Sequence, residues 1–238
     1  MPTILFQDFP LEHYFSKNKL GLQAQNNTKR ASWSQKLKKH HQIAQSIHIV
    51  GGPQISHSGD CLVYAILSEN NEAVLVDSGA GPGFPIVQKS LNELEISSVL
   101  QVLTTHVHID HVGAHAAVQK TYKCTIVAHE LAVEVLETGD RILSAADLYG
   151  LPLERCKVDE PLRGKSGNVA FNDYDIHWLH VPGHTPDSVV YYLDHPEAGR
   201  ILFAQDAHGP LDPRWGSDRV LFKQSLVELI ALEADLLC

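Results

Sequence analysis

Four side chains of the kinds that bind metal ions lie within one six-residue segment, 106–111. They are His106, His108, Asp110 and His111. Imidazole nitrogens together with a carboxylate suit a borderline divalent cation such as zinc. Side chains two residues apart on an extended segment share a face, so His106 and His108 can bind one ion together. Asp110 and His111 follow where a helix begins, so they point elsewhere and can reach a second ion.

Two further candidate ligands occur later, each after a predicted strand. The segment 106–111 itself follows an apolar run that predicts a buried strand over 99–104. His184 lies in a turn shaped by proline and glycine, and Asp206 lies at the end of a predicted strand. An isolated residue of either kind is common in loops. Their ordered occurrence at successive strand ends indicates a single metal centre.

The predicted elements fall into two halves, each with several strands followed by helix. The first half is predicted to hold strands over 47–50, 61–67, 73–77, 99–104 and 125–127 and helices over 86–94, 112–118, 130–137 and 140–149. The second half is predicted to hold strands over 169–171, 174–180, 188–193 and 200–204 and a helix over 221–232. In that helix Phe222, Leu226, Leu229 and Ile230 are spaced to share one face. Two sheets stacked face to face, with helices outside, would bury both sets of strands.

With these motifs the chain closely resembles the metallo-β-lactamase superfamily, and within it the glyoxalase-II-like hydrolases. The resemblance rests on residues 105–111, on Gly183-His184-Thr185 and on Asp206, and it covers roughly residues 45–238. It implies an α+β fold, a four-layer αββα sandwich with the metals at one edge of the sheets.

The resemblance also implies a role for each ligand. His106, His108 and His184 would bind the first ion, Asp110 and His111 the second, and Asp206 would bridge both. Asp77 matches a position that supports the site without binding an ion itself.

One ligand of that family has no counterpart here. A last histidine is expected just after the final strand, but no histidine follows His208. The run 234–238 predicts that final strand, and the sequence ends where the ligand would come next. We therefore expect that the sequence is cut short. The alternatives are a weakly held second ion, or His208 as a substitute ligand.

This ligand set predicts metal-assisted hydrolysis. Two zinc ions can hold a shared water as hydroxide at neutral pH, because metal binding lowers the pKa of water from about 15.7 towards 7. The hydroxide would attack the carbonyl carbon of a small-molecule ester, thioester or lactone while an ion stabilises the oxyanion. Asp110 is the candidate catalytic residue, which orients the nucleophile and carries a proton to the leaving group. Zinc is the expected cofactor, with iron and manganese as alternatives.

Two other functions stay open at this point. Persulfide dioxygenases resemble the pattern but hold one iron by two histidines and an aspartate, for which His106, His184 and Asp206 would serve. A degenerate member of the family would bind metal without turnover. A zinc β-lactamase with a cysteine ligand is disfavoured by Asp206, and a di-iron reductase by His108, where a glutamate is expected.

Residues that contact the substrate are harder to predict. His57, Arg214 and Trp215 lie in loops that are candidates to line the cleft.

Composition and charge narrow the class of protein. The 238 residues are 44% hydrophobic and 20% charged, which is ordinary for a soluble protein. No apolar run approaches the roughly 18 residues of a membrane span, and no secretory leader is apparent. Four widely spaced cysteines fit free thiols in the cytoplasm.

The charge is unevenly distributed along the chain. Of the net charge of −9, residues 1–45 contribute seven basic and two acidic side chains, which leaves −14 on the rest. That acidity disfavours nucleic acid as a partner. We interpret residues 1–45 as an N-terminal extension, a candidate arm, lid or homodimer contact, and residues 46–238 as the metallo-β-lactamase-like domain.

Overall fold

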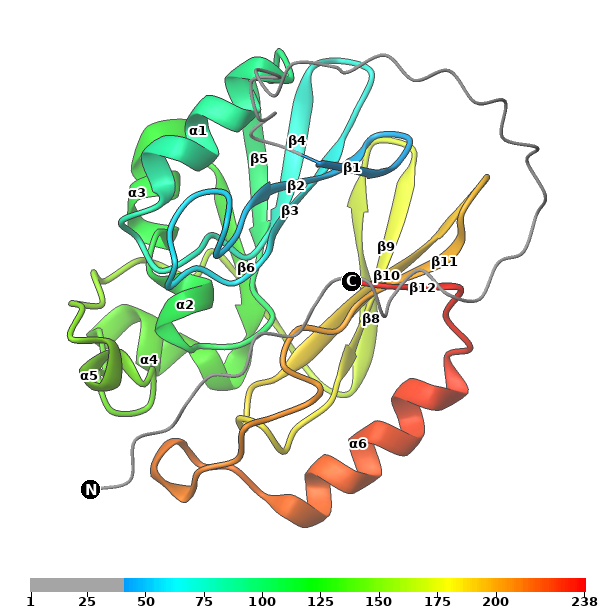
Figure 1. The fold of residues 1–238 in the computed structure, drawn as a ribbon. Coiled ribbons are helices and arrows are strands. Elements are labelled where there is room, and N and C mark those ends of the chain that lie inside the picture. Colours follow the sequence, from blue (N-terminus) through cyan, green and yellow to red (C-terminus); the bar gives the residue numbers. More distant parts are fainter. Residues whose placement is uncertain (1–40) are drawn as a thin grey trace, which may run out of the picture. The chain divides into compact units, whose positions relative to one another are not determined.

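Two β-sheets pack face to face in the computed structural model, which describes residues 41–238 (Figure 1). The first sheet has the order β1-β2-β3-β4-β5-β6-β7 and the second the order β12-β11-β10-β9-β8. The first consists of β1 (His41–Ala44), β2 (Ile47–Gly51), β3 (Val63–Leu67), β4 (Glu72–Val76), β5 (Ser98–Leu103), β6 (Thr125–His129) and β7 (Glu160–Leu162). The second consists of β8 (Ser166–Phe171), β9 (Tyr174–His180), β10 (Val189–His195), β11 (Gly199–Phe203) and β12 (Leu236–Leu237).

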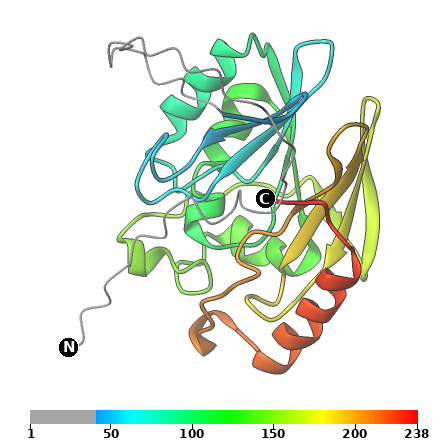
Figure 2. The ribbon, with the colours of Figure 1, turned by 45° about the vertical axis from the view of Figure 1, so that its right-hand side comes forward.

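Helices connect the strands and cover the outer faces. The α-helices are α1 (Phe84–Glu93), α2 (Ile109–Val112), α3 (His115–Tyr122), α4 (Val133–Thr138), α5 (Ala146–Tyr149) and α6 (Arg219–Ala231), and the 3-10 turns are η2 (Glu130–Ala132) and η3 (Pro213–Trp215). Helices α1 and α3 lie on the first sheet, and α6 lies against the second in both views (Figures 1 and 2).

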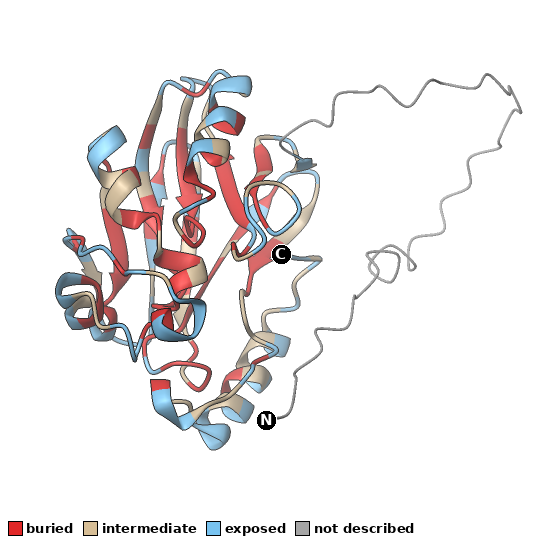
Figure 3. Cartoon of the chain, turned by 60° about the vertical axis from the view of Figure 1, so that its left-hand side comes forward, coloured by how far each residue is buried: buried red, intermediate tan, exposed pale blue. Residues whose placement is uncertain are grey.

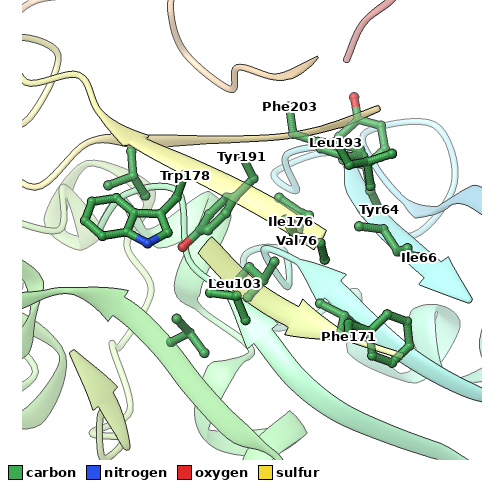
Figure 4. Packing of buried hydrophobic residues seen from close by; sticks show 14 of the residues in the cluster. Tyr64, Ile66, Val76, Leu103, Phe171, Ile176, Trp178, Tyr191, Leu193 and Phe203 are labelled. Carbon is green, nitrogen blue, oxygen red and sulfur yellow. The ribbon is translucent and has the colours of Figure 1, made fainter. Parts of the chain in front are cut away.

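The core between the sheets forms because the central strands of the first sheet, β3 and β4, are apolar on both faces. In β3, Tyr64 and Ile66 point towards the second sheet, while Val63 and Ala65 point towards α1 and α3. The ring of Tyr64 meets the ring of Phe203 edge to face, with centroids 5.2 Å apart (Figure 4). A third apolar layer packs α6 on β10 and β11.

These layers confirm the predicted α+β fold and the four-layer αββα sandwich. Buried residues concentrate on the strands, and exposed residues lie on the outer sides of the helices (Figure 3). None of the described helices is long and apolar enough to cross a membrane.

The structure differs from the sequence prediction in three elements. Residues 41–44, which we assigned to the N-terminal extension, form β1 and pair with β2; residues 1–40 of that extension lie outside the described residues. Strand β7 was not predicted. The helix predicted over 140–149 is reduced to α5, because the Asp140 carboxylate accepts the backbone N–H groups of Ile142 and Leu143 and forms a turn.

Fewer residues of helix α6 pack on the second sheet than the sequence predicts. Phe222, Leu226 and Leu229 line a pocket against the second sheet. Ile230 does not share that face, since it is 77% exposed. Consecutive residues are about 100° apart around a helix, so Leu229 and Ile230 cannot both face the sheet fully.

Candidate metal centre

Three connections that follow strands bring the candidate ligands together. His106 follows β5, His184 lies between β9 and β10, and Asp206 follows β11. Nitrogen and oxygen atoms of His106, His108, His184 and Asp206, the first ligand set, all lie within 4.8 Å of one another. His184 Nε2 is 3.2 Å from His106 Nε2 and 3.0 Å from His108 Nδ1. Residues that are 78 positions apart in sequence thus converge on one point.

A second ligand set shares Asp206 with the first. Asp110, His111 and Asp206 also offer atoms within 4.8 Å of one another. His111 Nε2 is 3.6 Å from an oxygen of Asp110 and 3.8 Å from Asp206 Oδ2. The same Oδ2 lies 3.3 Å from His184 Nε2, so Asp206 stands between the two sets.

Hydrogen bonds on the far side of each ring leave lone pairs facing the centre. The Pro210 carbonyl, which can only accept, lies 2.7 Å from His184 Nδ1, so Nδ1 carries the hydrogen. Thr105 Oγ1 donates to Asp77 and therefore accepts from His106 Nδ1 at 3.2 Å. The Nε2 atoms of His106 and His184 then present lone pairs to each other, an arrangement that a cation between them would stabilise.

His108 gives a second sign that the residues fit a cation. Its Nε2 is buried and has no hydrogen-bond partner within the described part of the chain, while its Nδ1 faces the first ligand set. Three histidines and a carboxylate are a donor set suited to zinc, iron or manganese.

The charges around the centre are consistent with a place for a cation. Burial and the neighbouring imidazoles hold the pKa of His106 well below its usual value, and burial lowers the pKa of His108 to about 3. Burial disfavours charge on Asp206, but its interactions with the imidazoles of His111, His184 and His106 outweigh burial and hold its pKa well below the usual range. Within the first ligand set, the imidazoles of His106 and His108 are therefore neutral and the Asp206 carboxylate is ionised.

In the second ligand set the acidic groups dominate. Burial lowers the pKa of His111, but the neighbouring Cys61, Asp110 and Asp77 outweigh it and raise the pKa well above its usual value. A proton on His111 thus neutralises charge that a bound cation would otherwise neutralise.

Asp77 supports both ligand sets from a fully buried position at the end of β4. Its carboxylate accepts hydrogen bonds from the backbone N–H and hydroxyl of Thr105 at 2.8 and 2.7 Å, and from His111 Nδ1 at 2.7 Å. Both Asp77 and Asp206 have a left-handed backbone, with φ of 59° and 55°. Aspartate tolerates this conformation better than most residues, and here it turns each carboxylate back after its strand.

The comparisons with known proteins agree with this geometry. Residues 58–238 match the model of the Metallo-beta-lactamase superfamily. The chain belongs to this superfamily.

Relatives within the superfamily are distant. A probable metallo-hydrolase of Methanocaldococcus jannaschii is 26% identical over 142 residues, which are 59% of this chain and 66% of that protein. The hydroxyacylglutathione hydrolase GloC of Haemophilus influenzae is 25% identical over 177 residues, 72% of this chain and 80% of that protein.

Solved structures show the same fold. The BLEG-1 B3 metallo-β-lactamase has a TM-score of 0.63 at 29% identity, over 76% of this chain and 83% of that one. BJP-1, a subclass B3 metallo-β-lactamase of Bradyrhizobium japonicum, has a TM-score of 0.69 at 21% identity, over 84% and 76%.

The predicted substrate residues of this metallo-β-lactamase superfamily member differ in their placement. Trp215 is buried, and its ring packs edge to face on the ring of His108, with centroids 4.9 Å apart. It therefore covers one side of the first ligand set. Arg214 points away to an ion pair with Asp212 at 2.6 Å. His57 is exposed, and its Nδ1 accepts the N–H of Gly59 at 3.1 Å. Substrate contact by these three residues remains a prediction.

His208, the alternative ligand, stays outside the centre. Its side chain is 81% exposed, and Nδ1 is 3.9 Å from Asp206 Oδ1, the oxygen that faces away from the other histidines. The structure does not bring it into either ligand set.

Two residues that lie near the ligands were not identified from the sequence. Cys61 lies beside Asp77 and His111, with ligand atoms within 4.8 Å of one another. Tyr149 lies near Asp110, since burial and then the charge of the Asp110 carboxylate raise the pKa of its hydroxyl. No local pattern marks either one, because each stands alone in its segment.

Gly183 lets α6 approach the centre. Its φ is 138°, and a Cβ there would lie 2.3 Å from the backbone nitrogen of Phe222. Only glycine permits both, so the turn that carries His184 packs directly on the helix.

Buried His115 gives the fold a dependence on pH. Its ring nitrogens bond Ser78 Oγ at 2.7 Å and Thr104 Oγ1 at 2.8 Å, and burial lowers its pKa to about 4. In the unfolded chain His115 takes up a proton near pH 6.5, whereas in the folded protein it does so only near pH 4. The free energy of unfolding is therefore highest above pH 6.5 and falls as the pH drops towards 4.

We expect His115→Gln to remove about 2 kcal/mol of the difference in the free energy of unfolding between pH 7 and pH 5. Urea unfolding of both metal-free proteins at the two pH values tests this. Equal pH dependence in the variant and the wild type would contradict it.

Proposed function

We propose that this chain is a hydrolase of small-molecule esters, thioesters or lactones that depends on a divalent metal, most simply two zinc ions. The observation that carries the proposal is the convergence of nitrogens from His106, His108 and His184 with the carboxylate of Asp206. Its membership of a superfamily with metallo-hydrolase relatives supports the same reaction class.

The residues of the two ligand sets have distinct roles in this proposal. A cation bound there would supply Lewis acidity, polarising a carbonyl and lowering the pKa of bound water from about 15.7 towards 7. Burial holds His106 and His108 neutral, and hydrogen bonds with Thr105 and Pro210 orient the rings of His106 and His184 as ligands. Trp215 packs on His108 and excludes water from that side of the first ligand set.

Asp110 is the proposed proton carrier. Burial raises the pKa of its carboxyl group, which brings the group closer to the pH range in which it can accept and return a proton. Its side chain is still 20% exposed, so a substrate can reach it. In this role Asp110 orients the attacking water and then protonates the leaving group.

The mononuclear iron alternative has less support. An iron site of two histidines and one carboxylate would use His106, His184 and Asp206 and leave His108 without a function. Yet His108 Nδ1 lies as close to His184 as His106 Nε2 does.

A metal-reconstitution experiment tests the proposal. The full chain is stripped of metal, reloaded with zinc, iron or manganese, and analysed for metal content. Two assays are then run on each metal form. One measures hydrolysis of p-nitrophenyl acetate, of an acyl thioester and of a lactone, and the other measures oxygen consumption with glutathione persulfide. We expect hydrolysis of at least one substrate only in the metal-loaded protein. Oxygen consumption with the iron form would indicate the dioxygenase, and metal uptake without any turnover a degenerate member.

A further inference from the structure

Gln205, the residue before Asp206, connects the two sheets beside the metal centre. It follows β11 of the second sheet, and its side-chain amide donates to the Leu62 carbonyl at 2.6 Å and to Asp77 Oδ2 at 3.2 Å. Leu62 precedes β3 and Asp77 follows β4, so both acceptors flank strands of the first sheet (Figure 1). They lie 143 and 128 positions from Gln205 in the sequence. One side chain thus joins the segment of Asp206 to the other half of the fold.

The two acceptors determine which way the amide of Gln205 points. A carbonyl oxygen and a carboxylate oxygen can only accept, so the amide nitrogen, with its two hydrogens, must face them. The same oxygen of Asp77 also accepts hydrogen bonds from Thr105 Oγ1 and from His111 Nδ1, each at 2.7 Å. Gln205 therefore belongs to the group of donors around Asp77 that also orients His111.

Asp206 occupies the third position of a four-residue turn. The N–H of Ala207 donates to the carbonyl of Ala204 at 3.1 Å, which makes Gln205 and Asp206 the two central residues. Asp206 has a φ of 55°, and a positive φ at this position of a turn favours glycine. The carbonyl of Asp206 in turn accepts the N–H of Gly209 at 3.0 Å. These bonds are local: they set the shape of the turn but do not connect it to the first sheet.

The position of this turn over the first sheet matters because the two ligand sets span both sheets. His106 and His111 come after β5 of the first sheet, whereas Asp206 comes after β11 of the second. The Oδ2 atom of Asp206 lies 3.7 Å from His106 Nε2 and 3.8 Å from His111 Nε2. Bonds from zinc to its ligands are about 2 Å long, so a small displacement of the turn would change whether Asp206 can reach an ion held by these histidines.

We propose that Gln205 is a positioning residue, whose amide anchors the turn of Asp206 to Leu62 and Asp77 and so aligns the shared carboxylate with the histidines that follow β5. The inference rests on the proposed function only in that Asp206 binds metal. Outer partners of metal ligands typically affect metal affinity by about 10- to 100-fold. Because both ligand sets share Asp206, loss of the anchor weakens binding in each of them.

The substitution Gln205→Met keeps the length of the side chain and removes the amide. The metal-free full chain is titrated with zinc by calorimetry and with cobalt, whose visible absorption reports the coordination of the bound ion. We expect the affinity for zinc to fall about 10- to 100-fold and the cobalt absorption bands to change in wavelength or intensity. Gln224→Met is the matched control, since Gln224 is exposed on α6. This control should bind both metals like the wild type.

The same substitution in an Asp206→Asn background tests whether the anchor acts through the shared carboxylate. Residues that act as a unit give non-additive effects in such a cycle. We expect Gln205→Met to lower the affinity for zinc much less in this background than in the wild type, because the carboxylate that it positions is already lost. An equal fold-loss in both backgrounds would show that Gln205 acts independently of Asp206 and would overturn the inference.

Urea unfolding of the metal-free proteins separates the positioning role from a loss of stability. A Gln205→Met variant that is less stable but binds zinc and cobalt like the wild type overturns the inference and leaves the proposed hydrolase unaffected. A chain that hydrolyses none of the substrates, yet loses affinity for zinc on this substitution, supports the positioning role and rejects the hydrolase. A wild-type chain that takes up neither metal overturns both.

Discussion

Replacing Asp206 with alanine is expected to remove the bound metal and the hydrolytic activity together. Its Oδ2 lies 3.3 to 3.8 Å from nitrogens of His106, His111 and His184, and it is the residue common to both ligand sets. Without it, neutral imidazoles face one another with no anion to balance a cation. We expect kcat/KM to fall at least about 10³-fold, which corresponds to about 4 kcal/mol of transition-state stabilisation. Metal content by elemental analysis and initial rates on the same preparation measure the two effects.

An exposed carboxylate provides the control. Asp194 lies at the end of β10 and pairs with Arg200 at 2.8 Å, away from both ligand sets. Asp194→Ala should retain full metal content and activity. Asp206→Asn keeps the shape of the side chain but removes its charge. Its metal content and activity should lie between those of Asp206→Ala and Asp194→Ala. An unchanged metal content in Asp206→Ala would rule out the bridging role.

The fold was predictable because the hydrophobic pattern records burial directly. In β3 the run from Val63 to Leu67 is apolar throughout, since the two faces of this strand pack in different layers. The same holds for β4, and together these runs indicate a sheet covered on both sides. Strand β7 escaped prediction because its three residues, with an exposed Glu160 and a proline, carry no such pattern.

The metal centre was predictable only where the ligands cluster in sequence or end a strand. His106 to His111 form a local motif, and His184 and Asp206 follow strands that meet at one edge. Cys61 and Tyr149 approach the centre through tertiary packing alone. A local sequence pattern cannot predict contacts of this kind. For the same reason, the sequence could suggest Trp215 as a cleft residue without showing that it packs on His108.

Asp77→Ala is expected to affect stability and metal binding at once, although Asp77 belongs to neither ligand set. Its carboxylate is fully buried and accepts hydrogen bonds from Thr105, His111 and, at 3.2 Å, Gln205 Nε2. Removing one partner of a buried charged pair leaves the other without compensation, which costs about 3 to 5 kcal/mol. The ring of His111 also loses the bond that fixes its orientation. We therefore expect the affinity for zinc to fall by about 10- to 100-fold.

Urea unfolding of the metal-free protein separates these two effects from each other. Because no ion is bound, the loss of stability there reports the buried hydrogen bonds alone, whereas zinc titration of the folded variant reports ligand orientation. Asp175→Ala is the control, since its carboxylate is exposed on β9 and lies 3.6 Å from His177 Nε2; its effect should stay within about 0.5 kcal/mol. A stability within about 1 kcal/mol of wild type in Asp77→Ala would mean that Thr105 and His111 find other partners. Asp77 would then be dispensable for the stability of the fold, and the zinc titration would decide whether it orients His111.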